Sequence, residues 1–126
     1  MARRNRPIPD ASIEKLGDDM KYVKFVKIAS TMLESESVEH YRATFPDVDD
    51  KVLDIIWKLK DNPVLGISEV ANSTVSEISR RYMLPLRSLH NWSSGARKCP
   101  NYVWIFLAYA VFSDLDILDE HKRADK

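Results

Sequence analysis

Side chains that suit the recognition of nucleic-acid bases stand close together near residue 90. An arginine can bridge O6 and N7 of guanine, and an asparagine can bridge N6 and N7 of adenine. Arg87 and Asn91 are of these types, and Leu86 can contact the methyl group of thymine. These side chains can act together only from the exposed face of one helix, so the elements that position them must be considered first.

The charge of the chain is balanced overall but unevenly distributed. The chain has 19 Lys and Arg residues and 19 Asp and Glu residues. Residues 78–112 nevertheless hold five basic residues and no acidic one, where about five acids would be expected by chance. An anionic partner explains this asymmetry, and the alternative is that the apolar run at 102–112 excludes acids as part of a core. Residues 28–77 show the opposite balance, with four basic and ten acidic residues.

Length and composition limit the classes of protein that the chain can represent. Its 126 residues suit one domain, or a small domain with an arm, and leave no room for a multi-domain enzyme. A single cysteine, Cys99, excludes an intramolecular disulfide and a cysteine-based zinc site. Neither a membrane-spanning apolar run nor an apolar signal core is present in the sequence. We therefore expect a soluble, cytoplasmic protein.

Apolar residues recur at three- and four-residue spacing, which predicts an all-α fold, a compact helical bundle with an N-terminal helical extension. The extension is expected to hold three helices, at residues 18–36, at 37–45 and, starting at Asp47 or Asp49, up to residue 61. The segment 22–28 also fits a strand. Ser37 can cap the second helix, which must end before Pro46, and Asn62-Pro63 ends the third.

The C-terminal half predicts a helix, a three-residue break and a second helix. Thr74 and Glu77 form a capping-box pattern that begins the first of these helices. Pro85 suits the first turn of the second helix, in which Leu89 and Trp92 continue the buried side. This succession is typical of a helix-turn-helix, and it turns the three base-reading candidates outward.

A last helix at residues 101–113 is apolar nearly all round. It carries more apolar surface than one small bundle usually hides, so part of it is expected to face a second subunit. The residues predicted to form this dimer interface are Trp104, Ile105, Ala108 and Phe112.

The segment 73–100 resembles the helix-turn-helix of the Cro and phage-repressor family, and the similarity extends over about residues 66–113. The matching positions are Thr74, Ile78-Ser79, Leu84, Leu89, Trp92, Gly95, Arg97-Lys98 and Pro100. Three positions depart from the family pattern. Val75 replaces a Gln that grips a phosphate, Met83 replaces the Gly of the turn, and Ser93 replaces an acidic residue. Met83 at a positive φ would cost roughly 1 kcal/mol.

The resemblance implies a double-stranded DNA-binding protein that reads the major groove with the helix around residues 85–93. The base-reading positions of the family correspond to Leu86, Arg87 and Asn91. The expected phosphate contacts are Thr74, Arg80, Arg81, Ser88, His90, Ser94, Arg97 and Lys98. Arg3, Arg4 and Arg6, in a basic arm at residues 1–9, suit a minor groove, and a solubilising tail is the alternative reading of this arm.

Other residues with chemical potential form no recognisable site in the sequence. His40, His90 and His121 are far apart and lack a second ligand three or four residues away, so we expect no metal. The acidic residues at 114–120 lack the glycine and the spacing of an EF-hand loop. Neither a glycine-rich phosphate loop nor a nucleophile motif is present. We therefore predict neither an enzyme nor a cofactor.

Two functional hypotheses from different classes follow. The first is a homodimeric, sequence-specific transcriptional regulator of the repressor type. The second is a phage or mobile-element protein-binding inhibitor or antitoxin, for example of the anti-CRISPR type, whose helix-turn-helix serves autorepression. That role would present the acidic region 28–77 to a basic protein partner. The expected organisation is a flexible arm at 1–9, an N-terminal helical region at 10–63, a helix-turn-helix domain at 64–113 and an acidic, polar tail at 114–126.

Overall fold

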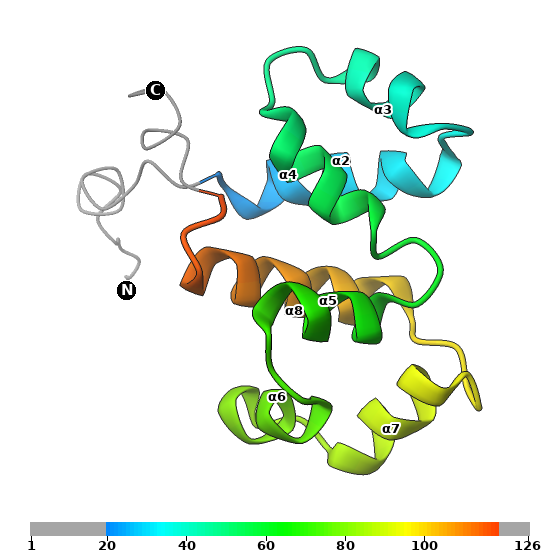
Figure 1. The fold of residues 1–126 in the computed structure, drawn as a ribbon, viewed down its shortest axis with the longest axis vertical. Coiled ribbons are helices and arrows are strands. Elements are labelled where there is room, and N and C mark those ends of the chain that lie inside the picture. The colour runs from blue at the N-terminus through cyan, green and yellow to red at the C-terminus, as the bar shows by residue number, and fades with distance from the viewer. Residues whose placement is uncertain (1–19, 119–126) are drawn as a thin grey trace, which may run out of the picture.

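The computed structural model describes residues 20–118, and every regular element in that part of the chain is an α-helix (Figure 1). The helices are α2 (Tyr22–Glu34), α3 (Val38–Thr44), α4 (Asp50–Trp57), α5 (Pro63–Ala71), α6 (Val75–Tyr82), α7 (Leu86–Ser94) and α8 (Asn101–Asp114). The all-helical class predicted from the apolar spacing is confirmed. The segment 22–28, which also fitted a strand, belongs to α2.

Short polar side chains begin three helices where the sequence predicts them. Ser37 and Asp49 each accept a hydrogen bond from a backbone N–H in the first turn of α3 and of α4, at 3.1 and 2.8 Å. At α6 the capping box is complete. The Thr74 hydroxyl accepts from Glu77 N at 3.1 Å, and the Glu77 carboxylate accepts from Thr74 N at 2.7 Å. The local sequence therefore fixes these helix starts.

Helix α5 is an element that the sequence pattern does not predict. Asn62-Pro63 follows α4 as expected, but it also begins α5. The Asn62 side chain accepts a hydrogen bond from Leu65 N at 3.2 Å, and Pro63 is the first helical residue. Gly66 in α5 lies very close to Lys58 and Leu59, the residues that follow α4. A Cβ atom on Gly66 would be 3.0 Å from the backbone oxygen of Lys58 and 2.7 Å from Cδ2 of the fully buried Leu59, so this close approach favours a glycine.

Helices α6 and α7 are joined by the short connection 83–85. Met83 has a left-handed backbone conformation, with φ 56° and ψ 45°, so the turn requires the geometry that favours glycine. The buried Ser79 of α6 forms two hydrogen bonds to the turn. Its hydroxyl donates to Leu84 O at 2.6 Å, and its carbonyl accepts from Leu84 N at 3.0 Å. Pro85 immediately precedes α7 as its N-cap.

Met83→Gly should raise the free energy of unfolding by roughly 1 kcal/mol, because glycine adopts a positive φ without a steric penalty. The Met83 side chain is 90% exposed, so its removal loses little packing. Urea denaturation of both proteins measures the difference. Met83→Ala retains the Cβ atom and is the control, which should remain close to the parent. Unchanged or lower stability of Met83→Gly would show that this turn is not strained.

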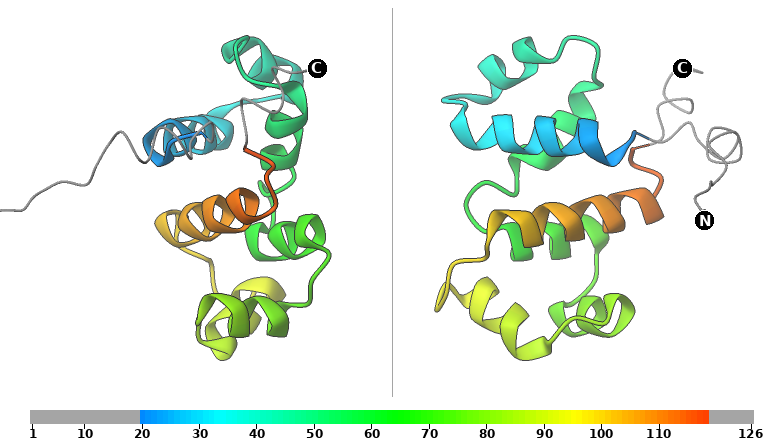
Figure 2. Two further views of the ribbon diagram at one scale, coloured as in Figure 1. Left: turned by 90° about the vertical axis from the view of Figure 1, so that its left-hand side faces the viewer. Right: turned by 180° about the vertical axis from the view of Figure 1, so that it is seen from behind.

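The described residues form three layers along the long axis of the molecule (Figures 1 and 2). Helices α2, α3 and α4 form one end, α5 and α8 lie in the middle, and α6 and α7 form the other end. The buried apolar residues make one cluster that runs from Met20 to Leu118 and includes all three layers. The N-terminal helices therefore pack on the rest of the chain through a shared core.

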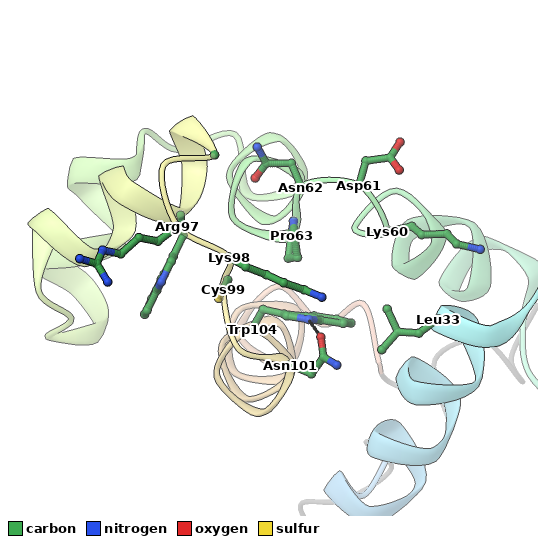
Figure 3. A pocket seen from close by; sticks show the side chains of 12 residues that line it. Leu33, Lys60, Asp61, Asn62, Pro63, Arg97, Lys98, Cys99, Asn101 and Trp104 are labelled. Carbon is green, nitrogen blue, oxygen red and sulfur yellow. Dashed lines mark hydrogen bonds between the residues drawn. The ribbon is translucent and has the colours of Figure 1, made fainter.

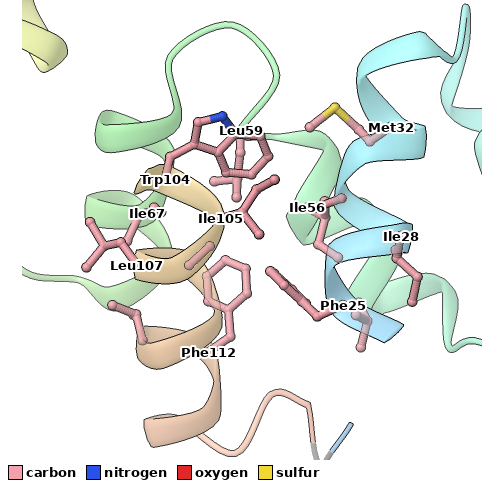
Figure 4. Close-up of a cluster of buried hydrophobic side chains, with 14 of the residues drawn as sticks. Phe25, Ile28, Met32, Ile56, Leu59, Ile67, Trp104, Ile105, Leu107 and Phe112 are labelled. Carbon is pink, nitrogen blue, oxygen red and sulfur yellow. The ribbon is translucent and has the colours of Figure 1, made fainter. Parts of the chain in front are cut away.

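Helix α8 is the central element of this core. Figure 4 shows its side chains between those of α2 and those of α5. On the α2 side, the rings of Phe25 and Phe112 are 6.2 Å apart, and the Tyr109 hydroxyl donates to Met20 O at 2.6 Å. On the α5 side lies Ile67, which is fully buried. A helix enclosed in this way must be apolar nearly all round.

This enclosure overturns the predicted dimer interface. Trp104, Ile105, Ala108 and Phe112 are each at most 5% exposed within the single chain. They cannot form a surface for a second subunit. The prediction is wrong because it did not foresee that α2 and α5 would both pack against α8 and cover the apolar surface assigned to a partner.

Candidate nucleic-acid interface

The exposed side of α7 carries the residues predicted to read bases. Leu89 on the other side is fully buried, as predicted, whereas Leu86 is 39% exposed and Arg87 is exposed. Asn91 is half-buried, and its backbone carbonyl accepts a hydrogen bond from Arg97 N at 3.1 Å. Because residues four apart share a helix face, Arg87 and Asn91 lie on the same side of α7. This helix belongs to the layer farthest from α2, α3 and α4 (Figure 2).

The residues predicted to contact phosphates lie on α6, on α7 and on the loop that follows it. The exposed ones are Thr74, Arg80, Arg81, His90, Ser94, Arg97 and Lys98, and Ser88 is half-buried. The structure therefore keeps nearly all of these polar groups exposed on α6, α7 and the loop that follows. Arg3, Arg4 and Arg6 of the predicted arm lie outside the described residues.

The five basic residues of 78–112 are all exposed, and none of them forms an ion pair with another described residue. By contrast, the Arg42 guanidinium at the other end of the molecule contacts the Asp54 carboxylate at 2.8 Å. Because no nearby carboxylate neutralises the five cations by contact, the positive potential around α7 remains available to an anionic partner.

Glu77 is the last acidic residue before this basic segment, and it is held at the start of α6. The hydrogen bonds from the backbone and side chain of Thr74, followed by the charges of Arg80 and Arg81, lower the pKa of Glu77 below its usual value. Its carboxylate is thus ionised and turned back toward the helix N-terminus, where the helix dipole favours a negative charge.

Two long-range hydrogen bonds fix α6 and α7 on the rest of the molecule. The Asn62 amide donates to Ser93 O at 2.9 Å and so joins the start of α5 to the end of α7. The Tyr82 hydroxyl donates to the Asp114 carboxylate at 2.7 Å and joins α6 to the end of α8. Partial burial, followed by this bond, raises the pKa of Tyr82 to about 12. Sequence reasoning missed both contacts, although Asn62 before Pro63 is a recognisable helix-start signal.

No protein-family model, curated protein or solved structure matches the chain. The resemblance to the Cro and phage-repressor family therefore rests on the residues quoted above. Two of the departures from that family have structural contacts here. Val75 packs half-buried against the core, and the Ser93 hydroxyl donates to His90 O at 3.2 Å.

Residues considered for other chemistry remain separate in the described part of the chain. Among residues 20–118, no three His, Cys, Asp or Glu side chains gather where they could hold a metal ion. His121 lies outside this range. Cys99 is buried, and burial raises the pKa of its thiol to about 11, so it stays protonated at neutral pH. None of the helices within 20–118 is both long and apolar enough to cross a membrane.

Proposed function

We propose that the chain is a sequence-specific double-stranded DNA-binding protein, in which α6 and α7 act as a helix-turn-helix and α7 enters the major groove. One observation supports this above all. Arg87 and the half-buried Asn91 share one side of α7, and Arg87 is one of five exposed basic residues in a segment, 78–112, that contains no acid. A major groove about 12 Å wide admits one α-helix, and residues near the start of that helix reach the base edges.

The proposed contacts divide into two classes with different effects. Arg87, Asn91 and Leu86 on α7 read base edges and therefore determine which sequence is preferred. Arg80, Arg97 and the other polar groups around the helix bind phosphates, and so set affinity and orientation without sequence preference. In this arrangement the chain acts as a transcriptional regulator, because a protein that occupies a defined operator competes with other proteins for that site.

The homodimer that such a regulator requires needs a surface other than the four buried residues. We propose the exposed aromatic face of α8, defined as Tyr102 and Phe106, which are 72% and 60% exposed. They are four residues apart and so lie on the same side of the helix. The Phe106 ring stacks on that of Tyr22 of α2 at 4.8 Å, which holds it in place on this surface. Two-fold related subunits would place one α7 in each of two successive major grooves.

Phe106→Glu should convert the dimer into a monomer, because a carboxylate at the centre of an apolar interface loses its hydration without a partner. Light scattering coupled to size-exclusion chromatography measures the mass, and circular dichroism checks that the helices persist. Leu65→Glu is the control, since Leu65 is 43% exposed on α5 rather than α8. A folded Phe106→Glu variant with the mass of the parent dimer would rule out this interface.

Selection of binding sites from a random duplex library tests the proposed function directly. It should be carried out with the whole chain at about 150 mM salt, where the charges are screened to about 8 Å. We expect enrichment of a two-fold symmetric motif whose half-sites are about 10 base pairs apart. The absence of any enriched sequence, with a protein shown to be folded, would contradict sequence-specific binding.

A protein-binding inhibitor or antitoxin is the second candidate function. It is favoured by the position of the acidic residues, because exposed Glu34, Glu36, Glu39 and Asp50 lie on or beside α2, α3 and α4, at the end of the molecule away from α7. DNA would be repelled by these carboxylates, whereas a basic protein would be attracted. Charge reversal of Glu36 and Glu39 to Lys should abolish such a partner's binding and leave DNA selection unchanged.

A further inference from the structure

A pocket of about 430 Å³ lies beside the middle layer, between α2, the α4–α5 connection, the end of α7 and the start of α8 (Figure 3). Its size falls in the range of roughly 300–1,000 Å³ that is typical of small-molecule sites. Leu33, Pro63, Trp92 and Trp104 provide its apolar and aromatic surfaces. A ligand in this position would touch both the N-terminal helices and the segment that carries α7.

Three polar side-chain groups that line the pocket, on Arg97, Lys98 and Asn101, are hydrogen-bond donors that donate to no other described residue. Figure 3 shows the Lys98 side chain and the Trp104 indole directed into the same space, with Leu33 facing them. The Trp104 indole N–H donates to Asn101 Oδ1 at 3.0 Å, which leaves the Asn101 NH2 group to donate elsewhere. The Lys98 ammonium and the Arg97 guanidinium form no ion pair or side-chain hydrogen bond with another described residue.

The other two charged residues that line the pocket, Lys60 and Asp61, do not neutralise Lys98 or Arg97. The Lys60 ammonium is engaged outside the pocket, where it donates to Ser35 O and lies 4.3 Å from the centre of the Trp57 ring. Asp61 is exposed, and Figure 3 shows its carboxylate directed away from Trp104 and Lys98. The pocket therefore presents positive charge and N–H donors next to aromatic walls.

We propose that this pocket binds a small organic anion with a flat ring, an aromatic carboxylate or a phosphorylated heterocycle. The ring would stack against the indole of Trp92, which is half-buried, because Trp104 is only 1% exposed. The carboxylate or phosphate would bind Lys98 and the Asn101 amide, since hydrogen bonds to an ionised acceptor are the strongest that these donors form. Either half of the ligand alone would bind less well, because the pocket complements both.

A consequence for DNA binding follows, and it rests on the proposed function. Arg97 and Lys98 line the pocket and are also proposed phosphate contacts. A bound anion would neutralise Lys98, whereas Figure 3 shows the Arg97 guanidinium directed to the opposite side. The anion would weaken DNA binding, and DNA would weaken the binding of the anion by the same factor. The ligand would thus act as an inducer. Binding of the anion itself needs no DNA and can be tested separately.

The test uses the tryptophan indole signals in the ¹H–¹⁵N spectrum of the whole protein. The chain has three tryptophans. Trp92 and Trp104 line the pocket, whereas Trp57 does not, and Trp92→Phe assigns the Trp92 signal. The probes are AMP and indole-3-acetate, with adenosine and inorganic phosphate as controls that carry only the ring or only the charge. We expect at least one ring anion to shift the Trp92 and Trp104 signals saturably, with a Kd below about 1 mM. Trp57 should shift least.

Variants decide whether the anion is recognised as proposed. Lys98→Gln should weaken the binding of that probe about tenfold, which corresponds to about 1.4 kcal/mol. Lys51→Gln is the matched control, because Lys51 is exposed on α4 and does not line the pocket, and it should bind as the parent does. The proposal is wrong if neither ring anion gives saturable shifts at millimolar concentration, if adenosine binds as tightly as AMP, or if Lys98→Gln has no effect. These outcomes leave the DNA hypothesis untouched, since no DNA is present.

Discussion

Trp104→Ala should lower the free energy of unfolding by roughly 3–5 kcal/mol, a large part of the 5–15 kcal/mol that stabilises a typical domain. Trp104 is 1% exposed and is the largest of the fully buried side chains. It lies at the start of α8, where Leu59, Ile105 and Met32 of different layers come together (Figure 4). Alanine would leave a cavity there, because helices fixed from several sides cannot collapse into the space.

Urea denaturation followed by circular dichroism measures this loss. Tyr102→Ala is the matched control, because Tyr102 is on the same helix, is aromatic and is 72% exposed. Its stability should stay within about 0.5 kcal/mol of the parent, as for most surface substitutions. Equal effects of the two substitutions would show that α8 is not enclosed between α2 and α5. They would also reopen the possibility that Trp104 faces another subunit.

The sequence predicts best those features that depend on a few neighbouring residues. The caps at Ser37 and Thr74 are confirmed, and of the alternatives Asp47 and Asp49 the structure uses Asp49. Such caps are predictable because a side chain that bonds to a backbone N–H two or three residues later needs no other part of the fold. The buried position of Leu89 follows in the same way from the three- and four-residue period of a helix.

Features that depend on distant segments were predicted less well. Whether an apolar residue of α8 faces a partner or the interior depends on α2 and α5, which begin 79 and 38 residues before α8. Trp92 has the spacing of a core residue, yet it is only half-buried, because it borders a pocket that the α4–α5 connection helps to form. The bond from Asn62 to Ser93 joins residues 31 apart, and no local pattern indicates it.

The candidate interface could be predicted only in part from neighbouring residues. The exposed side of α7 follows from its own periodicity, so the positions of Leu86 and Arg87 were predicted correctly. The residue types then indicate a chemistry, and their use on DNA is a prediction that only binding experiments test. The pocket could not be predicted, since its walls come from four segments that are brought together only by the folded chain.

Arg87→Ala should weaken binding to the selected DNA site by about 1–3 kcal/mol per half-site and relax the preference at one base pair. The reason is the bidentate geometry of a guanidinium on guanine O6 and N7, which no other base pair offers in the major groove. Arg87 is exposed on the first turn of α7 and forms no ion pair within the described residues. Its replacement should therefore leave the fold and the free energy of unfolding almost unchanged.

Arg97→Ala is the control that distinguishes the loss of a phosphate contact from the loss of a base contact. Arg97 is exposed on the loop after α7 and is proposed to bind a phosphate, so its loss should weaken binding to all sequences alike. It should also reduce the salt dependence, lowering the slope of log K against log salt by about one unit for each contact removed. Each of the two substitutions removes one positive charge, so a difference between their effects on DNA binding cannot be due to net charge.

Competition assays with the preferred duplex and with duplexes altered at single positions separate the two variants. If α7 reads bases, Arg87→Ala changes the ratio between preferred and altered duplexes, and Arg97→Ala changes only the common affinity. If both variants lower all affinities equally, Arg87 acts only as a charge. Binding would then depend on the phosphate backbone alone, and α7 would not be a recognition helix.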